Sequence, residues 1–564
     1  EIGEAVFGGG DADTVDISGG IVGTSVITDT GDDSVSISGT AEIGEDVATG
    51  EGEDSIEITG GSIGGSVFAG AGGDTIDVSG GTIEGAVLGE GGDDVVTVSG
   101  EADIGIGAAG PNSVDLGGGD DDFTMTGGML AGDVSGATGL DTFDISGGEI
   151  GGSVTGGDGG DVFDVSGGSI AGSIFGDEGN DGVTISGDAD IGVAEGEVDS
   201  VGLGAGDDSV TMTGGRLAGA LSGGAGADTF DISGGTIESF ISGGEADDVI
   251  DISGGTVAGS VYGDAGDDSV MVSGDAEIGI SGEEIDSVGL GEGDDRFTMS
   301  GGALAGSVSG GSGTDTFDIS GGTIGTFVAG GEDDDVINVS GGTIEGSIFG
   351  DDGDDEVNVS GGTVAGSVIG GGGADTVSVS GGTIEGDIQA ETVTLTGGTI
   401  GGDITGISAD TLTIEADDLT LRDGVLFSGT GAVGTITATT LAAGGFSQNF
   451  AGFASLGLFE GSTLRFTGGT QGIAELILSS GSTLFATGTT TLWAGEGLGN
   501  LTLMGSTLNM VNGSTADTLD VGNLTLDGGT LAIDLDAEAG LADRINAAGA
   551  IAASGANTIA VSLV

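Results

Sequence analysis

The sequence predicts an all-β protein, a parallel β-solenoid with coils of about 20 residues. An aspartate recurs about every twenty residues through the first 389 residues, and a short stretch of alternating apolar and polar residues follows each one. Glycine accounts for 134 of the 564 residues, and in helices each would cost about 1 kcal/mol. A twenty-residue unit cannot bury a core alone, but units stacked in register bury their apolar residues between layers.

Each unit consists of a Gly/Asp turn, a short strand, a Ser-Gly-Gly corner and a second apolar stretch. In the unit that starts at Gly223, Phe230 and Ile232 should face inward while Thr229 and Asp231 face outward, because side chains alternate along a strand. Eighteen aspartates hold the equivalent position at the end of the turn: Asp13, Asp33, Asp54, Asp74, Asp94, Asp122, Asp141, Asp161, Asp181, Asp208, Asp228, Asp248, Asp268, Asp295, Asp315, Asp335, Asp355 and Asp375.

Three units are longer than the others, with steps of 26 to 28 residues that end at Asp122, Asp208 and Asp295. Asp122 to Asp208 spans 86 residues and Asp208 to Asp295 spans 87, so a four-coil super-repeat is layered on the single coil. The extra residues should protrude at similar positions about every four coils. They are either relics of block duplication or a ridge used for lateral contacts.

The charge of the chain restricts its function. It has 94 acidic residues, five arginines and no Lys, His or Cys, which gives a net charge of -89. Such a chain cannot assemble the basic patch that nucleic acid or an anionic membrane requires. It also lacks the usual nucleophile–base pairs and the nitrogen and sulfur ligands of zinc. We therefore expect no enzyme, no nucleic-acid partner and no insertion into a bilayer. Cations are the natural partners, through carboxylate oxygens.

The turns carry the pattern GGxGxD. It recurs at residues 156–161, 223–228, 310–315 and 370–375, and with an acidic second residue at 176–181, 263–268 and 350–355. Glycine permits the positive φ values that aim backbone carbonyls inward, and the aspartate supplies a charged oxygen. The pattern resembles the repeats-in-toxin (RTX) nonapeptide GGxGxDxUx, whose turns bind Ca²⁺ between neighbouring coils. RTX turns recur every nine residues on two edges, whereas one turn per coil here implies a single calcium-bearing edge.

Electrostatics points to a bound cation independently of that resemblance. Carboxylates stacked about 5 Å apart repel one another by on the order of 3 kcal/mol per pair at an effective dielectric of 20. Summed over the repeats, this repulsion reaches a typical domain stability of roughly 5 to 15 kcal/mol. Bound Ca²⁺ would neutralise it; screening by salt is the second explanation, and the third is that Gly and Asp merely suit tight turns with Asp facing solvent. The candidate ligands are Asp74, Asp141, Asp161, Asp181, Asp208, Asp228, Asp248, Asp268, Asp315, Asp335, Asp355 and Asp375.

A serine row accompanies the corners. Its hydroxyls could bind ice or sugar, but they are expected to satisfy backbone groups of the corner. The row includes Ser146, Ser166, Ser233, Ser253, Ser320 and Ser340.

The acidic turns end after Asp375, and three regions are expected: repeats over residues 1–389, less regular solenoid over 390–520, and a cap over 521–564. The cap contains GNLTLDGGTLAIDLD and then Gly540, Asp543, Arg544 and Ile545 in a G-x-x-D-R-hydrophobic pattern. This end resembles that of pertactin-like autotransporter passengers. The resemblance implies a right-handed parallel β-helix, secreted through the outer membrane of a Gram-negative bacterium, whose C-terminal coils act as an autochaperone.

These observations favour a non-enzymatic, Ca²⁺-stabilised protein, secreted or at the cell surface, that acts as an adhesin or structural rod. Its partners would be calcium ions, surface receptors or glycans, and other copies of itself. A self-assembling surface layer or extracellular filament is the first alternative. A carbohydrate-active β-helix using paired Asp is the second, but the long units, which alone break the repeat, lack aromatic residues for a sugar subsite.

Overall fold

The computed structural model is a parallel β-solenoid of about 23 coils with about 20 residues per turn, which confirms the predicted fold class. No helix occurs among the described residues, and so no helix that could cross a membrane is found there. The structure describes residues 1–564 except 108–111, 193–198, 280–285, 408–410, 415–419, 422–425, 438–448, 460–462, 467–468, 480, 487, 493–497, 513, 537–538, 540 and 564.

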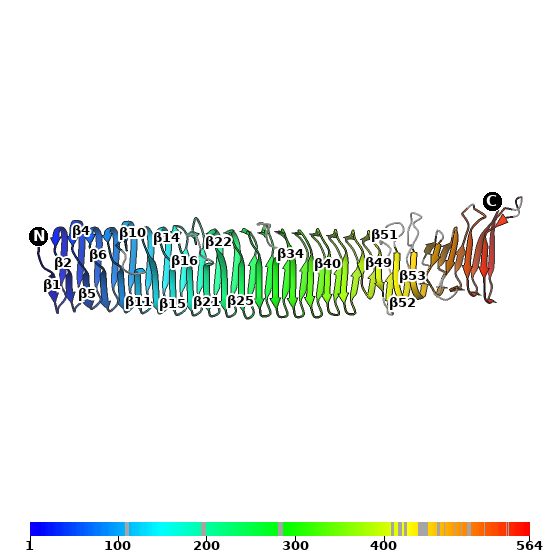
Figure 1. Cartoon of the computed structure of the whole chain (residues 1–564), viewed down its shortest axis with the longest axis horizontal. Helices are drawn as coiled ribbons and strands as arrows, with labels where there is room; N and C mark the ends of the chain where they lie inside the picture. Colours follow the sequence, from blue (N-terminus) through cyan, green and yellow to red (C-terminus); the bar gives the residue numbers. More distant parts are fainter. Residues whose placement is uncertain are drawn as a thin grey trace. The chain divides into compact units, whose positions relative to one another are not determined.

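The chain forms two compact units. Unit 1 contains residues 1–295 and 302–305, and unit 2 contains residues 296–301 and 306–564. Within each unit, strands of successive coils lie side by side (Figure 1). Each unit is described by itself below.

A coil of unit 1 contributes three strands, shown by β16 (Val162–Val165), β17 (Ser169–Ile170) and β18 (Ile174–Glu178). Every strand pairs in parallel with its equivalent one coil away, so that Phe143 lies opposite Phe163. The twenty-residue offset arises because a parallel pairing between identical coils keeps each apolar residue over its copy. Further strands of this four-coil period are β12 (Asp122–Leu130), β13 (Asp133–Thr138), β14 (Thr142–Ile150), β15 (Val154–Asp158), β19 (Gly182–Ile185), β20 (Asp190–Ile191) and β21 (Asp199–Ala205).

The coils of unit 2 repeat this arrangement. In β35 (Thr316–Ile319) and β38 (Val336–Val339), Phe317 lies opposite Ile337 at the same twenty-residue offset. The remaining strands of these two coils and the next are β36 (Thr323–Ile324), β37 (Val328–Glu332), β39 (Thr343–Ile344), β40 (Ile348–Asp352) and β41 (Glu356–Val359).

The core of each unit consists of rows of stacked apolar side chains. The rings of Phe143 and Phe163 stack face to face with centroids 4.7 Å apart. Phe230 and Ile232 are 0% and 2% exposed, while Thr229 and Asp231 on the same strand are exposed, which confirms the predicted faces. Burial of such a row stabilises the stack by roughly 1.5 to 3 kcal/mol per large side chain.

Parallel coils continue to the C-terminal part of unit 2 at larger offsets. There β61 (Thr518–Val521) pairs with β65 (Arg544–Ala547). An antiparallel pair is formed by β63 (Thr530–Asp536) and β64 (Leu541–Ala542). Of the residues that carry the autotransporter resemblance, Gly540 lies outside the described residues.

Candidate metal site at the aspartate turns

The turn between the third strand of one coil and the first strand of the next has six residues. In residues 156–161, which begin within β15 and end just before β16, Gly157 and Gly159 have φ values of +112° and +146°. Positive φ recurs at the second and fourth positions of the turns in both units. The glycines of GGxGxD at these two positions are therefore explained by backbone conformation.

The aspartate at the sixth turn position is buried in seventeen coils, and we call this row the aspartate ladder. Its side chains are between 0% and 3% exposed, whereas Asp13 at the start of the row is partly exposed. The interpretation in which these residues face solvent is therefore wrong. The ladder consists of Asp33, Asp54, Asp74, Asp94, Asp121, Asp141, Asp161, Asp181, Asp208, Asp228, Asp248, Asp268, Asp295, Asp315, Asp335, Asp355 and Asp375.

The sequence prediction for one ladder residue was wrong. Asp122 is exposed and is the first residue of β12, while Asp121 is buried in the ladder. The three long steps are therefore all 27 residues, and the super-repeat is 87 residues in both intervals. Three consecutive aspartates stand at residues 120–122, so the pattern itself gave no means of choosing among them.

Each ladder carboxylate reaches back to the preceding coil. The Oδ1 atom of Asp161 accepts a hydrogen bond from the backbone N–H of Asp141 at 2.8 Å, and Oδ1 of Asp181 accepts from Asp161 at 2.7 Å. Equivalent bonds along the rest of the ladder measure 2.7 to 3.2 Å. The turn N–H groups are thus satisfied by charged acceptors, which form the stronger class of hydrogen bond.

The second carboxylate oxygen, Oδ2, is buried without a hydrogen-bond donor in most of the ladder, and it points into its own turn. A Cβ atom added to Gly156 would lie 2.1 Å from Oδ2 of Asp161. The close approach of this oxygen explains the glycine at the first position of this turn, whereas the turns of the long units have Leu116, Leu203 and Leu290 there. The orphaned Oδ2 atoms include those of Asp74, Asp94, Asp121, Asp141, Asp161, Asp181, Asp208, Asp228, Asp248, Asp268, Asp335, Asp355 and Asp375.

A backbone carbonyl of the next coil faces the same space. A Cβ added to Gly223 would lie 2.1 Å from Oδ2 of Asp228 and 2.5 Å from the carbonyl oxygen of Gly243. The same pair of oxygens recurs at Gly330, with Asp335 Oδ2 at 2.2 Å and Gly350 O at 2.6 Å. Two acceptor oxygens that converge, one of them a carboxylate oxygen without a donor, form an arrangement that a cation stabilises.

Burial also disfavours the charged form of these carboxylates. Burial, with a smaller contribution from the charges of Asp121 and Asp161, raises the pKa of Asp141 to about 7. The same causes, burial foremost, raise the pKa of Asp228 to about 7 and that of Asp74 to about 6. Without a bound cation, part of the ladder is therefore protonated near neutral pH.

A second, exposed row of acids runs beside the ladder, at the fifth turn position. The Oδ1 atom of Asp247 accepts the backbone N–H of Asp267 at 2.8 Å, so this row reaches forward to the next coil. Asp120 and Asp334 accept in the same way from Leu140 and Asp354, at 3.0 and 2.7 Å. The sequence analysis missed this row, although the recurring Asp-Asp pairs were its signal.

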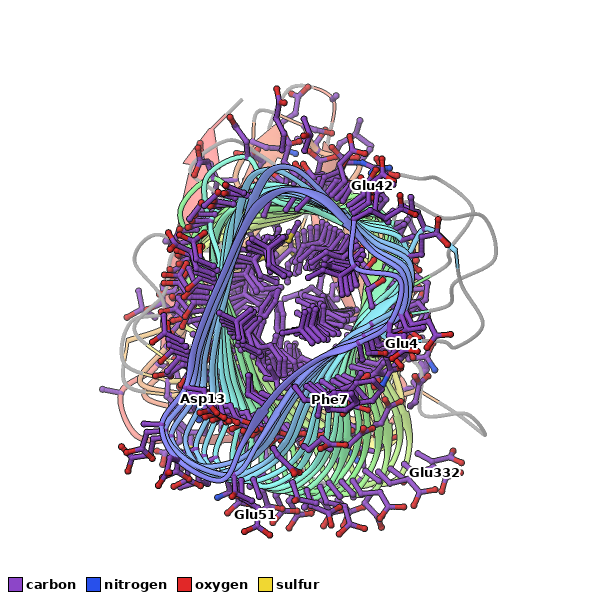
Figure 2. The ribbon with its side chains drawn as sticks, turned by 90° about the vertical axis from the view of Figure 1, so that its left-hand side faces the viewer. Glu4, Phe7, Asp13, Glu42, Glu51 and Glu332 are labelled. Atoms are coloured by element: carbon purple, nitrogen blue, oxygen red, sulfur yellow. The ribbon has the colours of Figure 1, made fainter. Side chains whose placement is uncertain are left out.

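Figure 2 shows how the acids divide at the turn: Asp13 points into it, whereas Glu51 and Glu332 point away into solvent. In the part of the chain that the structure describes, no three acidic side chains converge as a complete metal-binding group. A cation bound at a turn would therefore combine ladder carboxylate oxygens with backbone carbonyls. Oxygen ligands of this kind suit Ca²⁺, which accepts six to eight of them in flexible geometry.

The serine row serves the corners as expected in unit 2. The hydroxyl groups of Ser320 and Ser340 donate to the carbonyl oxygens of Met299 and Ile319, at 3.3 and 3.4 Å. These bonds link one coil to the previous one.

Fold and turns together define an acidic parallel β-solenoid with a buried ladder of turn aspartates. Neither a scan against protein-family models nor a search of curated proteins finds a match. Among solved structures, the chain is similar to a hyperactive, Ca²⁺-dependent, β-helical antifreeze protein from an Antarctic bacterium. The identity is 18%, the match covers 62% of this chain and 83% of that chain, and the TM-score is 0.32. At that TM-score the similarity carries no argument about function, and the RTX and autotransporter resemblances stay predictions.

A buried ladder aspartate should contribute more to the free energy of unfolding than an exposed aspartate at the fifth turn position. Replacing Asp248 by Ala leaves the buried N–H of Asp228 without its acceptor, so we expect a loss of about 1 to 3 kcal/mol in the free energy of unfolding. Asp247→Ala is the matched control and should cost less than about 1 kcal/mol, because its hydrogen bond is exposed. Chemical denaturation in calcium-containing buffer measures both. Equal losses would contradict the structural role of the ladder.

Proposed function

We propose that the chain is a non-enzymatic extracellular protein whose coils are held together by Ca²⁺ at the aspartate turns. The observation that carries this proposal is the pair of oxygens, Oδ2 of a ladder aspartate and a carbonyl of the next coil, which converge in one space where the buried Oδ2 has no donor. A divalent cation there would bridge adjacent coils and offset the repulsion between stacked carboxylates.

We propose that the protein acts at the cell surface as an adhesin or structural rod. Its structure consists of repeated coils rather than a fold built around a single reactive centre. Support comes from the uniform register of the coils and from a composition without His, Cys or Lys. Secretion as an autotransporter passenger is supported by Asp543, Arg544 and Ile545, which match the end of such passengers. An extracellular setting would supply calcium at the concentration that weak protein sites require.

Calorimetric titration of the full chain with CaCl₂ at about pH 7.5 tests calcium binding. We expect several ions per chain, and fewer ions in a variant with Asp121, Asp248 and Asp335 replaced by Asn. Asparagine keeps an oxygen that accepts the N–H of the preceding coil but removes the charge. The matched control replaces the neighbouring exposed residues Asp120, Asp247 and Asp334 by Asn and should bind nearly as many ions as the unaltered chain.

Two outcomes would contradict the proposal. The first is the absence of calcium uptake by the unaltered chain at millimolar concentration. The second is an equal loss of ions in the buried and exposed variants, which would indicate a diffuse ion atmosphere around an acidic surface.

A further inference from the structure

Acidic residues at the second turn position occupy a backbone conformation that L residues rarely adopt: Asp29, with a φ of +82°, in the turn that ends at Asp33, and four others farther along the chain. Glu90, Asp177, Asp264 and Asp351 stand at the second turn position, with φ values of +76°, +76°, +79° and +79°. In most other coils this position is glycine. A carboxylate side chain is therefore retained at these four turns against a conformational cost, and backbone strain of this kind concentrates at functional positions.

These four residues follow the period of the super-repeat. Successive members are 87 residues apart, and the first three lie in the turn before a long unit. A second set of turns with the same period has the opposite character: residues 136–141, 223–228 and 310–315 contain no acid except the ladder aspartate. The turns of Glu90, Asp177 and Asp264 are thus each followed, two turns later, by an acid-poor turn, while two further acid-poor turns, at residues 69–74 and 370–375, fall outside this period.

The additional carboxylates act on the ladder. The charge of Asp177 raises the pKa of Asp161 and of Asp181, in each case after burial as the larger cause. Asp264 acts likewise on Asp248, and Asp351 on Asp355. The side chains of Asp177, Asp264 and Asp351 are thus exposed carboxylates in the same turns as the buried ladder residues on which their charges act.

Each acid-rich turn also contains the orphaned ladder oxygen. Asp181, Asp268 and Asp355 are each 2% exposed, and their Oδ2 atoms have no donor. These atoms lie 2.1, 2.3 and 2.2 Å from a Cβ added to the glycine at the first turn position. At one of these turns, the carboxylate of Asp264 also accepts a hydrogen bond from the hydroxyl of Ser242.

We propose that the turns containing Glu90, Asp177, Asp264 and Asp351 are the high-affinity Ca²⁺ sites of the ladder, and that the acid-poor turns bind weakly. This inference rests on the proposed function, since it assigns a rank among the calcium sites. Affinity rises with the number of charged ligands, so a second carboxylate per turn strengthens binding while its strain and repulsion destabilise the calcium-free coil. Calcium would then occupy one tight site in each 87-residue super-repeat before it binds at the remaining turns.

The test compares two triple variants of the full chain by calcium titration and thermal melting. Asp177, Asp264 and Asp351 are replaced together by Asn, which tolerates the left-handed conformation but lacks the charge. This variant should lose three tight sites, each weakened about tenfold or more, and keep the weak class. Replacement of the same three residues by Gly should also raise the melting temperature in excess chelator, because both strain and repulsion are removed.

Ala137→Gly is the matched control. Ala137 occupies the same turn position with a φ of +75° in an acid-poor turn, so glycine relieves similar strain without removing a charge. Its calcium isotherm should equal that of the unaltered chain. Two results would overturn the inference: more tight sites in the Asn variant than the single one expected at the unaltered Glu90 turn, or a single affinity class in the unaltered chain. Uniform binding would leave the proposed function standing, whereas no binding at all would reject both.

Discussion

Removing calcium at about pH 7.5 is expected to lower the melting temperature of the chain by more than about 20 °C. Thirteen ladder aspartates are buried in unit 1, from Asp33 to Asp295, and four in unit 2, from Asp315 to Asp375. A ligand present at one hundred times its Kd stabilises the folded state by about 2.7 kcal/mol per site. In a solenoid such contributions add along the stack, because each coil depends on its neighbours.

Circular dichroism at a β-sheet wavelength, recorded on heating in calcium and in excess chelator, measures this difference. Sodium chloride added to the chelated protein is the control for general screening, and magnesium is the control for ion size. If sodium chloride restores the melting temperature as well as calcium does, screening replaces specific binding as the explanation. A melting temperature that chelation leaves unchanged would reject any stabilising role of calcium.

The calcium-free chain should be more stable at about pH 5 than at about pH 8. In the folded state the pKa values of Asp94 and Asp268 are raised to about 7, chiefly by burial, from the ordinary value of 3.8. Between those values the folded ladder binds more protons than the unfolded chain. The free energy of unfolding therefore falls as the pH rises through this window, and it is highest where the ladder is protonated.

Calcium should change this dependence. It binds the deprotonated carboxylate, so the rise in melting temperature that calcium produces should be large at about pH 8 and small at about pH 5. Melting curves at four or five pH values, each with calcium and with chelator, give both profiles. The variant with Asp121, Asp248 and Asp335 replaced by Asn should show a shallower profile in chelator. A calcium-free chain that becomes more stable as the pH rises would contradict the raised pKa values.

The sequence was sufficient to predict the coils and their inner faces. A period of twenty residues with apolar residues at fixed positions permits one solution, parallel stacking in register, because a slip of one residue would turn Phe230 and Ile232 toward solvent. The row of turn aspartates followed from the same period. It could be placed without coordinates because stacking in register puts equivalent residues of successive coils directly next to one another.

The environment of that row was decided by contacts between coils. Whether Asp121 or Asp122 joins the ladder depends on which of them lies under Asp141, and this is a matter of register across 27 residues after a long unit. The burial of the ladder, the orphaned Oδ2 atoms and the forward-reaching row at Asp120, Asp247 and Asp334 depend in the same way on the neighbouring coil. The hydrogen-bond partners and the desolvation of these carboxylates come from residues twenty or more positions away. A pattern within one repeat therefore specifies which side chains stack, but it does not specify the hydrogen-bond partners or the burial of each carboxylate oxygen.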